Sequence, residues 1–215
     1  MEDKTFGNLE VLCQRIEELE ARPVVLPAQD VVVDNRVTFK CFVPRCVFFG
    51  FNLMCPPNIM PAEQFKKVLE KYHVAILIQL NIYSAGFSPE TCGDLSLAWE
   101  DMNHGNKVPT CNAGIYLDNL KRAQARLYDI LEEMESLCLK QGYLFAAGLA
   151  AGGCALCDEC VGVQFGHRCP HPFRARPSME GLGIDVVTTA KKVGLKLDFS
   201  PGSITRSWLG LLLVD

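Results

Sequence analysis

Four cysteines in the C-terminal half of the chain have the spacing of iron–sulfur ligands. Cys154, Cys157, Cys160 and Cys169 form a C-x2-C-x2-C-x8-C motif, and Pro170 follows directly. Three thiolates two residues apart can turn toward one cluster while a fourth arrives from farther along, as in the C-x2-C-x2-C and C-P elements of ferredoxin-type sites. Gly152-Gly153 allows a close approach of backbone N–H groups to sulfur. The motif therefore predicts a [4Fe-4S] cluster.

Two other interpretations of these four cysteines stay open. Four thiolates are a common ligand set for structural zinc, although zinc sites usually show two separated C-x2-C pairs. Buried thiols with no metal are the third interpretation, because free cysteine behaves as a small hydrophobic residue. The spacing favours the cluster over both.

A second group of cysteines lies in the N-terminal half. Cys41, Cys46 and Cys55 form a C-x4-C-x8-C motif that Pro56 follows, and phenylalanines interleave with the thiols. Three thiolates leave one position of a metal centre open, and an open position can take a substrate atom. Alternatively, Cys92, Cys111 or a histidine completes the set, or the group is a buried cluster of thiols without metal. The trio predicts a second metal site.

Weaker signals surround the C-terminal motif. His167 and His171 flank Cys169, where an imidazole could bond to sulfur or relay a proton, although a surface role is more common. Arg168, Arg174 and Arg176 form a local basic group that could bind an anionic substrate or an acidic partner, or offset the charge of a thiolate-bound cluster.

Composition narrows the function classes. The chain has 215 residues, 11 cysteines, 49% hydrophobic residues and a net charge of −4, without a basic block, so we expect no nucleic-acid partner. No apolar stretch approaches the ~20 residues of a membrane span, and Met-Glu-Asp-Lys opens no secretory signal. We therefore expect no membrane association and a cytoplasmic location, where structural disulfides are rare.

The elements that must position these cysteines can be predicted from hydrophobic periodicity and from turn residues. Helices are expected over 6–21, 61–72, 117–140 and 183–193, and strands over 24–26, 31–33, 37–39, 74–83, 143–149 and 208–214. Cysteine-rich segments fill 41–57 and 152–172, and 84–114 is an irregular insertion. The alternation predicts a single α/β domain over 1–215, with a mixed sheet flanked by helices and two cysteine-rich cluster-binding loops.

Several runs together resemble a known family. They are Val24–Asp34, Val37–Cys41, Met54–Pro57, Gly153–Cys160, Cys169–Pro172, Ala175–Glu180 and Leu182–Val186. The chain resembles the cysteine-rich "predicted metal-binding protein" family, a domain of unknown function found mostly in anaerobic bacteria and archaea. The resemblance implies that the cysteines bind metal, and it implies no reaction.

Three functions follow as hypotheses. The first is a cytosolic iron–sulfur protein that carries electrons to or from a redox partner protein. The second is an enzyme in which an open-site [4Fe-4S] cluster on Cys41, Cys46 and Cys55 activates a small-molecule substrate. The third is a zinc-stabilised binding module. Whether the chain is an enzyme, and its oligomeric state, stay open at this point.

Overall fold

A four-stranded antiparallel sheet forms the centre of the molecule. The computed structural model describes residues 3–83, 113–157, 159–161, 168–197 and 205–215. The strands are β1 (Arg22–Pro27), β2 (Val74–Tyr83), β3 (Ala146–Ala150) and β4 (Thr205–Val214), in the order β1-β2-β4-β3. β2 and β4 pair over their full lengths, from Val74 opposite Val214 to Tyr83 opposite Thr205.

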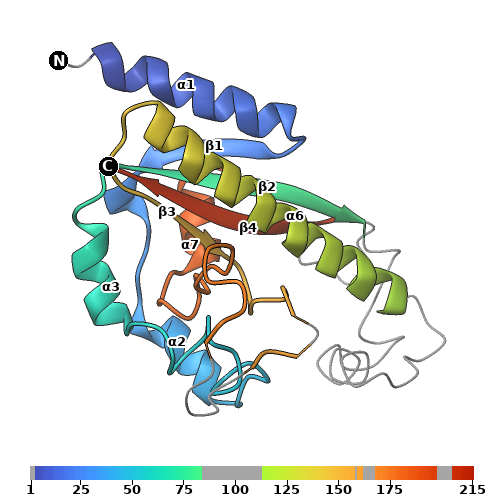
Figure 1. The fold of residues 1–215 in the computed structure, drawn as a ribbon. Coiled ribbons are helices and arrows are strands. Elements are labelled where there is room, and N and C mark those ends of the chain that lie inside the picture. The colour runs from blue at the N-terminus through green and yellow to red at the C-terminus, as the bar shows by residue number, and fades with distance from the viewer. Residues whose placement is uncertain (1–2, 84–112, 158, 162–167, 198–204) are drawn as a thin grey trace.

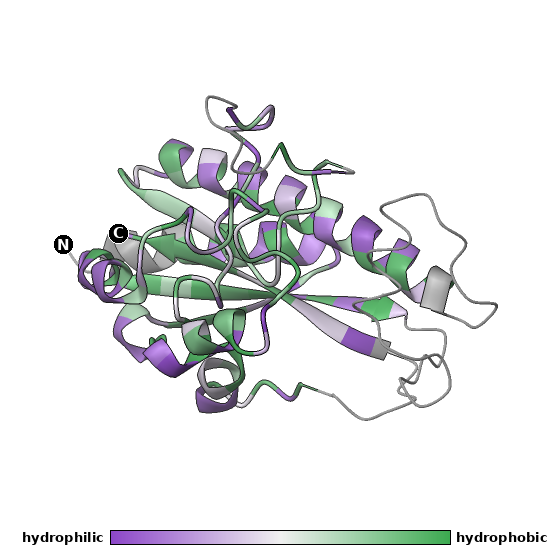
Figure 2. Ribbon diagram, turned by 90° about the horizontal axis from the view of Figure 1, so that it is seen from below, coloured by the Kyte–Doolittle hydropathy of each residue, from purple (hydrophilic) through white to green (hydrophobic). Residues whose placement is uncertain are grey.

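Both faces of the sheet are buried along the central part of β2 and β4, because Val74–Leu80 and Trp208–Val214 are mostly apolar. On one face, Ile76, Ile78 and Leu212 pack against helices α1 (Asp3–Glu18) and α6 (Ala113–Lys140). On the other, Leu77 and Leu211 pack in one cluster with Phe65, Leu69 and the chain around 179–195. Successive strand residues point to opposite faces, so a strand covered on both sides is a continuous apolar run. Figure 2 shows these apolar strands between helices with hydrophilic outer surfaces.

The shorter helices share the second face. They are α2 (Asn35–Phe42), α3 (Ala62–Leu69) and α7 (Val186–Lys192), and a 3-10 turn η1 (Ala28–Asp30) follows β1. In Figure 1 they lie on the opposite side of the sheet from α1 and α6. The long helix α6 covers the first face, and Cys154 packs against the core on that face.

The predicted α/β class is confirmed, and three details differ. Residues 31–33 were expected to form a strand, but of these only Val33 makes a β-bridge, with Ile184. The sheet was expected to be mixed, but every pairing between its described strands is antiparallel. Residues 37–39 were expected to form a strand, but they lie inside α2. Asp34 begins this helix, because its carboxylate accepts a 2.8 Å hydrogen bond from the N–H of Arg36. This N-cap outweighs the preference of the β-branched Val37 and Thr38 for a strand.

The ends of β3 and α7 place the two cysteine-rich segments. β3 leads through Ala151 into Gly152 and Gly153, and the Ala151 N–H donates to the Leu209 carbonyl of β4. An antiparallel bridge between Val33 and Ile184 joins the start of α2 to the start of α7. The insertion predicted over 84–114 lies, up to residue 112, outside the described residues.

Candidate metal centre

The four C-terminal cysteines line one narrow cleft. Cys154, Cys157, Cys160 and Cys169 share it with Asn52, Leu53, Met54 and His171. Its free volume is about 10 Å³, close to that of one water-sized sphere. The turn that carries Cys157 and Cys160 would therefore have to move outward to admit a cluster. Their side chains are half-buried on this surface turn.

Two sulfurs of this set accept hydrogen bonds. The His171 N–H donates to Sγ of Cys169 at 3.4 Å. Cys154 accepts from the Leu156 N–H and from the Tyr128 hydroxyl. Burial raises the pKa of the Cys154 thiol, and these two bonds act against that rise because they stabilise the thiolate. Thiolate is the form that binds metal, so the donor set fits a thiolate-ligated centre.

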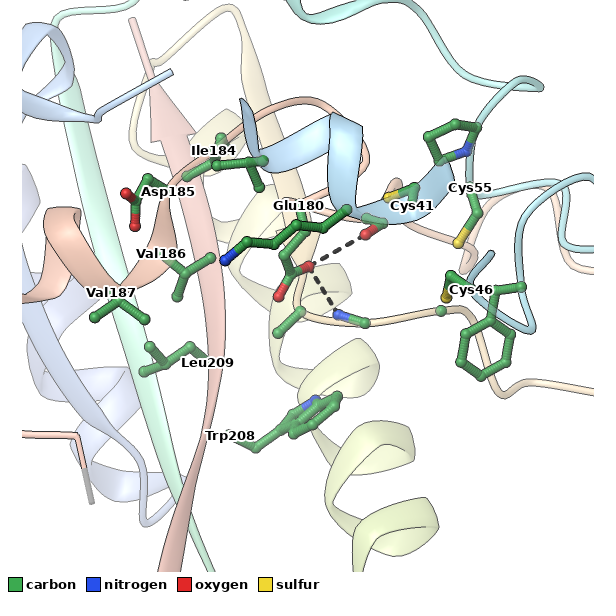
Figure 3. Close-up of a pocket in the computed structure, with 18 of the residues that line it drawn as sticks. Cys41, Cys46, Cys55, Glu180, Ile184, Asp185, Val186, Val187, Trp208 and Leu209 are labelled. Atoms are coloured by element: carbon green, nitrogen blue, oxygen red, sulfur yellow. Dashed lines mark hydrogen bonds between the residues drawn. The ribbon is translucent and has the colours of Figure 1, made fainter. Parts of the chain in front are cut away.

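The N-terminal trio is held by α2 and the turns after it. Cys41 lies in the last turn of α2, and the Cys46 N–H donates to its carbonyl at 3.1 Å. Cys55 is 5% exposed, and its N–H donates to the carbonyl of Asn52 at 3.1 Å. All three sulfur-bearing residues border one cavity (Figure 3).

Electrostatics couple the trio. Burial raises the pKa of Cys55 far above that of a free thiol, and the neighbouring Cys46 and Cys41 raise it further. Burial also raises the pKa of Cys41, and the nearby Cys46 and Glu180 raise it further. Three thiolates here would repel one another in a poorly solvated site, so a bound cation is what could keep them ionised together.

The two cysteine groups lie side by side. Asn52, three residues before Cys55, donates its side-chain N–H to the carbonyl of Cys154 at 2.8 Å. Gly153 packs on the ring of Phe48, so closely that an added Cβ would stand 2.6 Å from Phe48 Cγ. Segment 52–54 therefore borders the C-terminal cleft, and Cys55, the next residue, belongs to the trio.

The cavity beside the trio is large and mostly apolar. It has a volume of about 520 Å³ and extends from the cysteines to Trp208 of β4 and to Val186 and Val187 of α7. Glu180 is the carboxylate toward its centre in Figure 3. Glu180 Oε2 accepts from the Gly152 N–H at 2.9 Å and from the Ser178 hydroxyl at 3.2 Å. Burial raises the pKa of this carboxyl, although those bonds lower it.

The predicted basic group has a structural role in part. Arg176 is buried, and its Nη2 donates to Glu135 of α6 at 2.5 Å. Arg174 pairs with Asp129 and, at 3.5 Å, with Glu132. Both therefore bind the segment after Cys169 to α6. Arg168 is exposed, and His167, Cys92 and Cys111 lie outside the described residues.

Glu180, Tyr128 and Asn52 were not singled out from the sequence as site residues. Tyr128 belongs to the apolar stripe of α6 and reads as core, with 1% exposure. Glu180 follows Met179 in one of the runs that carry the family resemblance, which was the available signal. Asn52 is a loop asparagine, and its bond to Cys154 spans 102 residues.

Two searches of the structure bear on metal and membrane. Within the described ranges, no three or more His, Cys, Asp or Glu side chains already stand at the spacing that holds a single metal ion. None of the helices in those ranges is long and apolar enough to cross a membrane.

Comparison with known proteins gives one match. A family model described as "Predicted metal-binding protein (DUF2284)" covers residues 24–214. Searches of curated proteins and of solved structures found no match. The matched range contains both cysteine groups and the whole sheet.

Proposed function

Because the chain belongs to the predicted metal-binding protein family, we propose that it is an iron–sulfur protein that carries electrons. Cys154, Cys157, Cys160 and Cys169 would hold one [4Fe-4S] cluster, which supplies one-electron transfer when bound. The observation that carries the proposal is that four cysteines with this spacing line one cleft. A reducing compartment such as the cytoplasm would keep the thiols available, and a redox protein is the expected partner.

The chain contributes hydrogen bonds to this site. The N–H groups of His171 and Leu156 and the hydroxyl of Tyr128 donate to ligand sulfurs. Such donors stabilise negative charge on sulfur, and the reduced state of a cluster carries more of it. They would therefore raise the reduction potential. The Asn52 bond to the Cys154 carbonyl holds the start of the ligand turn in place.

Cys157→Ser tests the assignment of the four-cysteine set. We expect the variant, purified without oxygen, to lose most of about four irons and their matching sulfide per chain, because one ligand is missing. Iron, sulfide and zinc analysis measures this. Cys13→Ser is the matched control, since Cys13 is also half-buried but lies on α1, and it should keep its iron.

Two results would contradict this proposal. Unchanged iron in Cys157→Ser would remove the C-terminal assignment. Zinc without sulfide in the unsubstituted protein would replace the iron–sulfur centre with a structural zinc site, which the small free volume of the cleft would accommodate.

A second candidate function is catalysis at the trio. Cys41, Cys46 and Cys55 border a cavity of about 520 Å³, within the range of small-molecule sites, whereas the four-cysteine cleft is nearly filled. Three thiolates on a centre would leave a ligand position facing that cavity. An open-site iron–sulfur enzyme acting on a small substrate is thus the alternative to simple electron transfer.

The trio can be tested with a small ligand. If it holds a second cluster, the protein should contain about eight irons per chain, and cyanide should change the EPR spectrum of the reduced protein. Cys46→Ser should lower the iron to about four and abolish the cyanide effect. A spectrum that does not respond in the unsubstituted protein would argue against an open centre.

A further inference from the structure

The cavity beside the trio contains one polar group whose hydrogen bonding is unevenly used. Both hydrogen bonds that Glu180 receives from other residues go to Oε2. Its other oxygen, Oε1, receives neither of them. Figure 3 shows the carboxylate between the cysteines and the apolar residues of α7 and β4.

Most other polar groups of the cavity are already engaged, but the buried indole N–H of Trp208 has no hydrogen-bond partner in the described part of the chain. Asp185 accepts from the N–H and hydroxyl of Thr188, at 2.9 and 2.7 Å. The Ser207 hydroxyl accepts from Gln79 at 2.6 Å. Lys40 borders the cavity but is exposed to solvent. Glu180 is therefore the acidic group that an occupant of the cavity would have to satisfy, and the Trp208 N–H is a donor on the same wall.

The walls of the cavity favour a ligand with an apolar surface. Aliphatic side chains of α2 and α7 face aromatic ones, and the wall residues include Val37, Val186, Val187, Phe48, Phe49 and Trp208. Most of the lining is hydrocarbon, so an apolar body gains free energy by entering, while a buried anion would lose its hydration. Pockets with apolar walls and few convergent polar groups are typical of small-molecule sites.

We propose that this cavity binds a neutral, largely apolar organic molecule that places a hydroxyl group against Glu180. A hydroxyl both donates and accepts, so it can bond to the carboxyl whether or not that group is protonated. When Glu180 is ionised, a carboxylate in the same position would set one acceptor against another. The inference deepens the catalytic candidate and rests on it for the role of the three thiols, but binding is measured apart from metal content.

Trp208 provides the signal for the test. The chain has two tryptophans, Trp99 and Trp208, so Trp99→Phe leaves a single fluorophore on the cavity wall. The probes are 1-adamantanol and 1-adamantanecarboxylate, which share an apolar body and do not absorb at the excitation wavelength. The protein is used as purified without oxygen, and its iron content is recorded separately.

We expect 1-adamantanol to give a saturable change in Trp208 fluorescence and the carboxylate to bind about tenfold more weakly or worse. Glu180→Gln should shrink this difference to about threefold or less, because an amide can donate to the carboxylate. Glu10→Gln, an exposed carboxylate on α1, is the control and should leave the difference unchanged.

Val187→Phe supplies an independent check. The larger side chain narrows the cavity, so it should weaken binding of 1-adamantanol at least about tenfold, with circular dichroism confirming the fold. No saturable response to 1-adamantanol overturns the proposal, as does equal affinity for both probes or binding unaffected by Glu180→Gln and Val187→Phe. If the protein purified without oxygen contains no iron but still binds 1-adamantanol, the metal assignment is contradicted and the proposal for this cavity stands.

Discussion

At Cys154, burial and hydrogen bonding act on one sulfur in opposite directions. Burial disfavours the thiolate and raises its pKa, while donors from Leu156 and Tyr128 favour it. Without a metal ion, the effect of burial is the larger, so the pKa of Cys154 is raised. A bound metal ion would supply the positive charge that stabilises a buried thiolate, and the two donors would then act on a sulfur that stays ionised.

Tyr128→Phe should lower the reduction potential of a cluster at the C-terminal site. The ring still fills its place in the core, where Tyr128 is 1% exposed, and only the hydroxyl is lost. One hydrogen bond of about 0.5–1.5 kcal/mol corresponds to roughly 20–60 mV for one electron. A redox titration followed by EPR measures the shift, and iron content should stay constant.

Tyr72→Phe is the comparison for this substitution. Tyr72 packs beside the core on the opposite face of the sheet from Tyr128, so removing its hydroxyl should leave the potential unchanged. If both variants shift the potential equally, the hydroxyl of Tyr128 has no special access to the sulfur.

At the residue scale, the sequence predicts candidate metal ligands where their spacing is local. The two cysteine groups could be proposed because cysteines with two, four or eight residues between them form a local pattern. Tyr128 and Glu180 could not be predicted as site residues, because one acts across 26 residues on Cys154 and the other through a cavity that only the packed chain creates.

Two short helices form the walls of the cavity, and each begins at an aspartate. Asp34 caps α2 and Asp185 caps α7, and the segments just before them are joined. The Asp34 N–H donates to the Gly183 carbonyl, and the Asp185 N–H donates to that of Val32, both at 2.8 Å. Cys41 and Val187 are thereby held on opposite sides of one cavity.

Asp185→Ala should destabilise the protein by about 1 kcal/mol, which lowers Tm by about 2–4 °C for a chain of this size. Burial raises the pKa of Asp185, but bonds from Thr188 outweigh it and the net pKa is lowered. The cap is therefore fully effective above about pH 4 and is lost as pH falls through the lowered pKa.

Calorimetry at several pH values checks both parts. The Tm difference between the unsubstituted protein and Asp185→Ala should be constant from pH 7 to 5 and shrink as pH falls below 4. Asp185→Asn keeps an uncharged cap, so it should cost little at neutral pH. A Tm difference that grows in acid would show that the carboxylate is not the stabilising form.

Helices and strands could be predicted well where the pattern was long. The helix expected over 117–140 is α6, and the strands expected over 74–83 and 208–214 are β2 and β4. The strand expected over 37–39 was wrong because three β-branched or aromatic residues weigh less than a capped helix. In short segments, the capping residue decides whether a helix or a strand forms, and here the N-terminus of α2 is fixed by the single hydrogen bond to the Asp34 side chain.

For the molecule as a whole, the close packing of the two cysteine-rich segments is the main result. Gly153 and Phe48 touch where the segments meet, 105 positions apart by their numbers. No spacing rule connects residues so distant. The relative direction of the strands could not be predicted either, because an alternation of helices and strands does not determine it. The described strands all pair antiparallel.

Gly153→Ala should disturb both cysteine groups at once. Its Cβ would stand 2.6 Å from the Phe48 ring, and overpacking of this kind costs about 1–3 kcal/mol. We expect lower Tm and lower iron content. Adding Phe48→Ala should restore much of both, since the smaller side chain makes room. If the losses of Tm and iron in the double variant equal the sum of the losses in the two single variants, the contact does not join the segments.

The position of β4 sets the order in which this molecule can be completed. β4 pairs with β2 on one side and β3 on the other, and among the described strands those two do not pair with each other. Until β4 has been synthesised, the sheet is two separate pieces, and Ala151 lacks the Leu209 carbonyl that anchors the turn before Cys154. Such long-range pairing forms late in folding. We therefore expect any metal to be inserted only after β4 has been made, because a nascent chain halted before Thr205 would present its cysteines without the strand pairing that holds them.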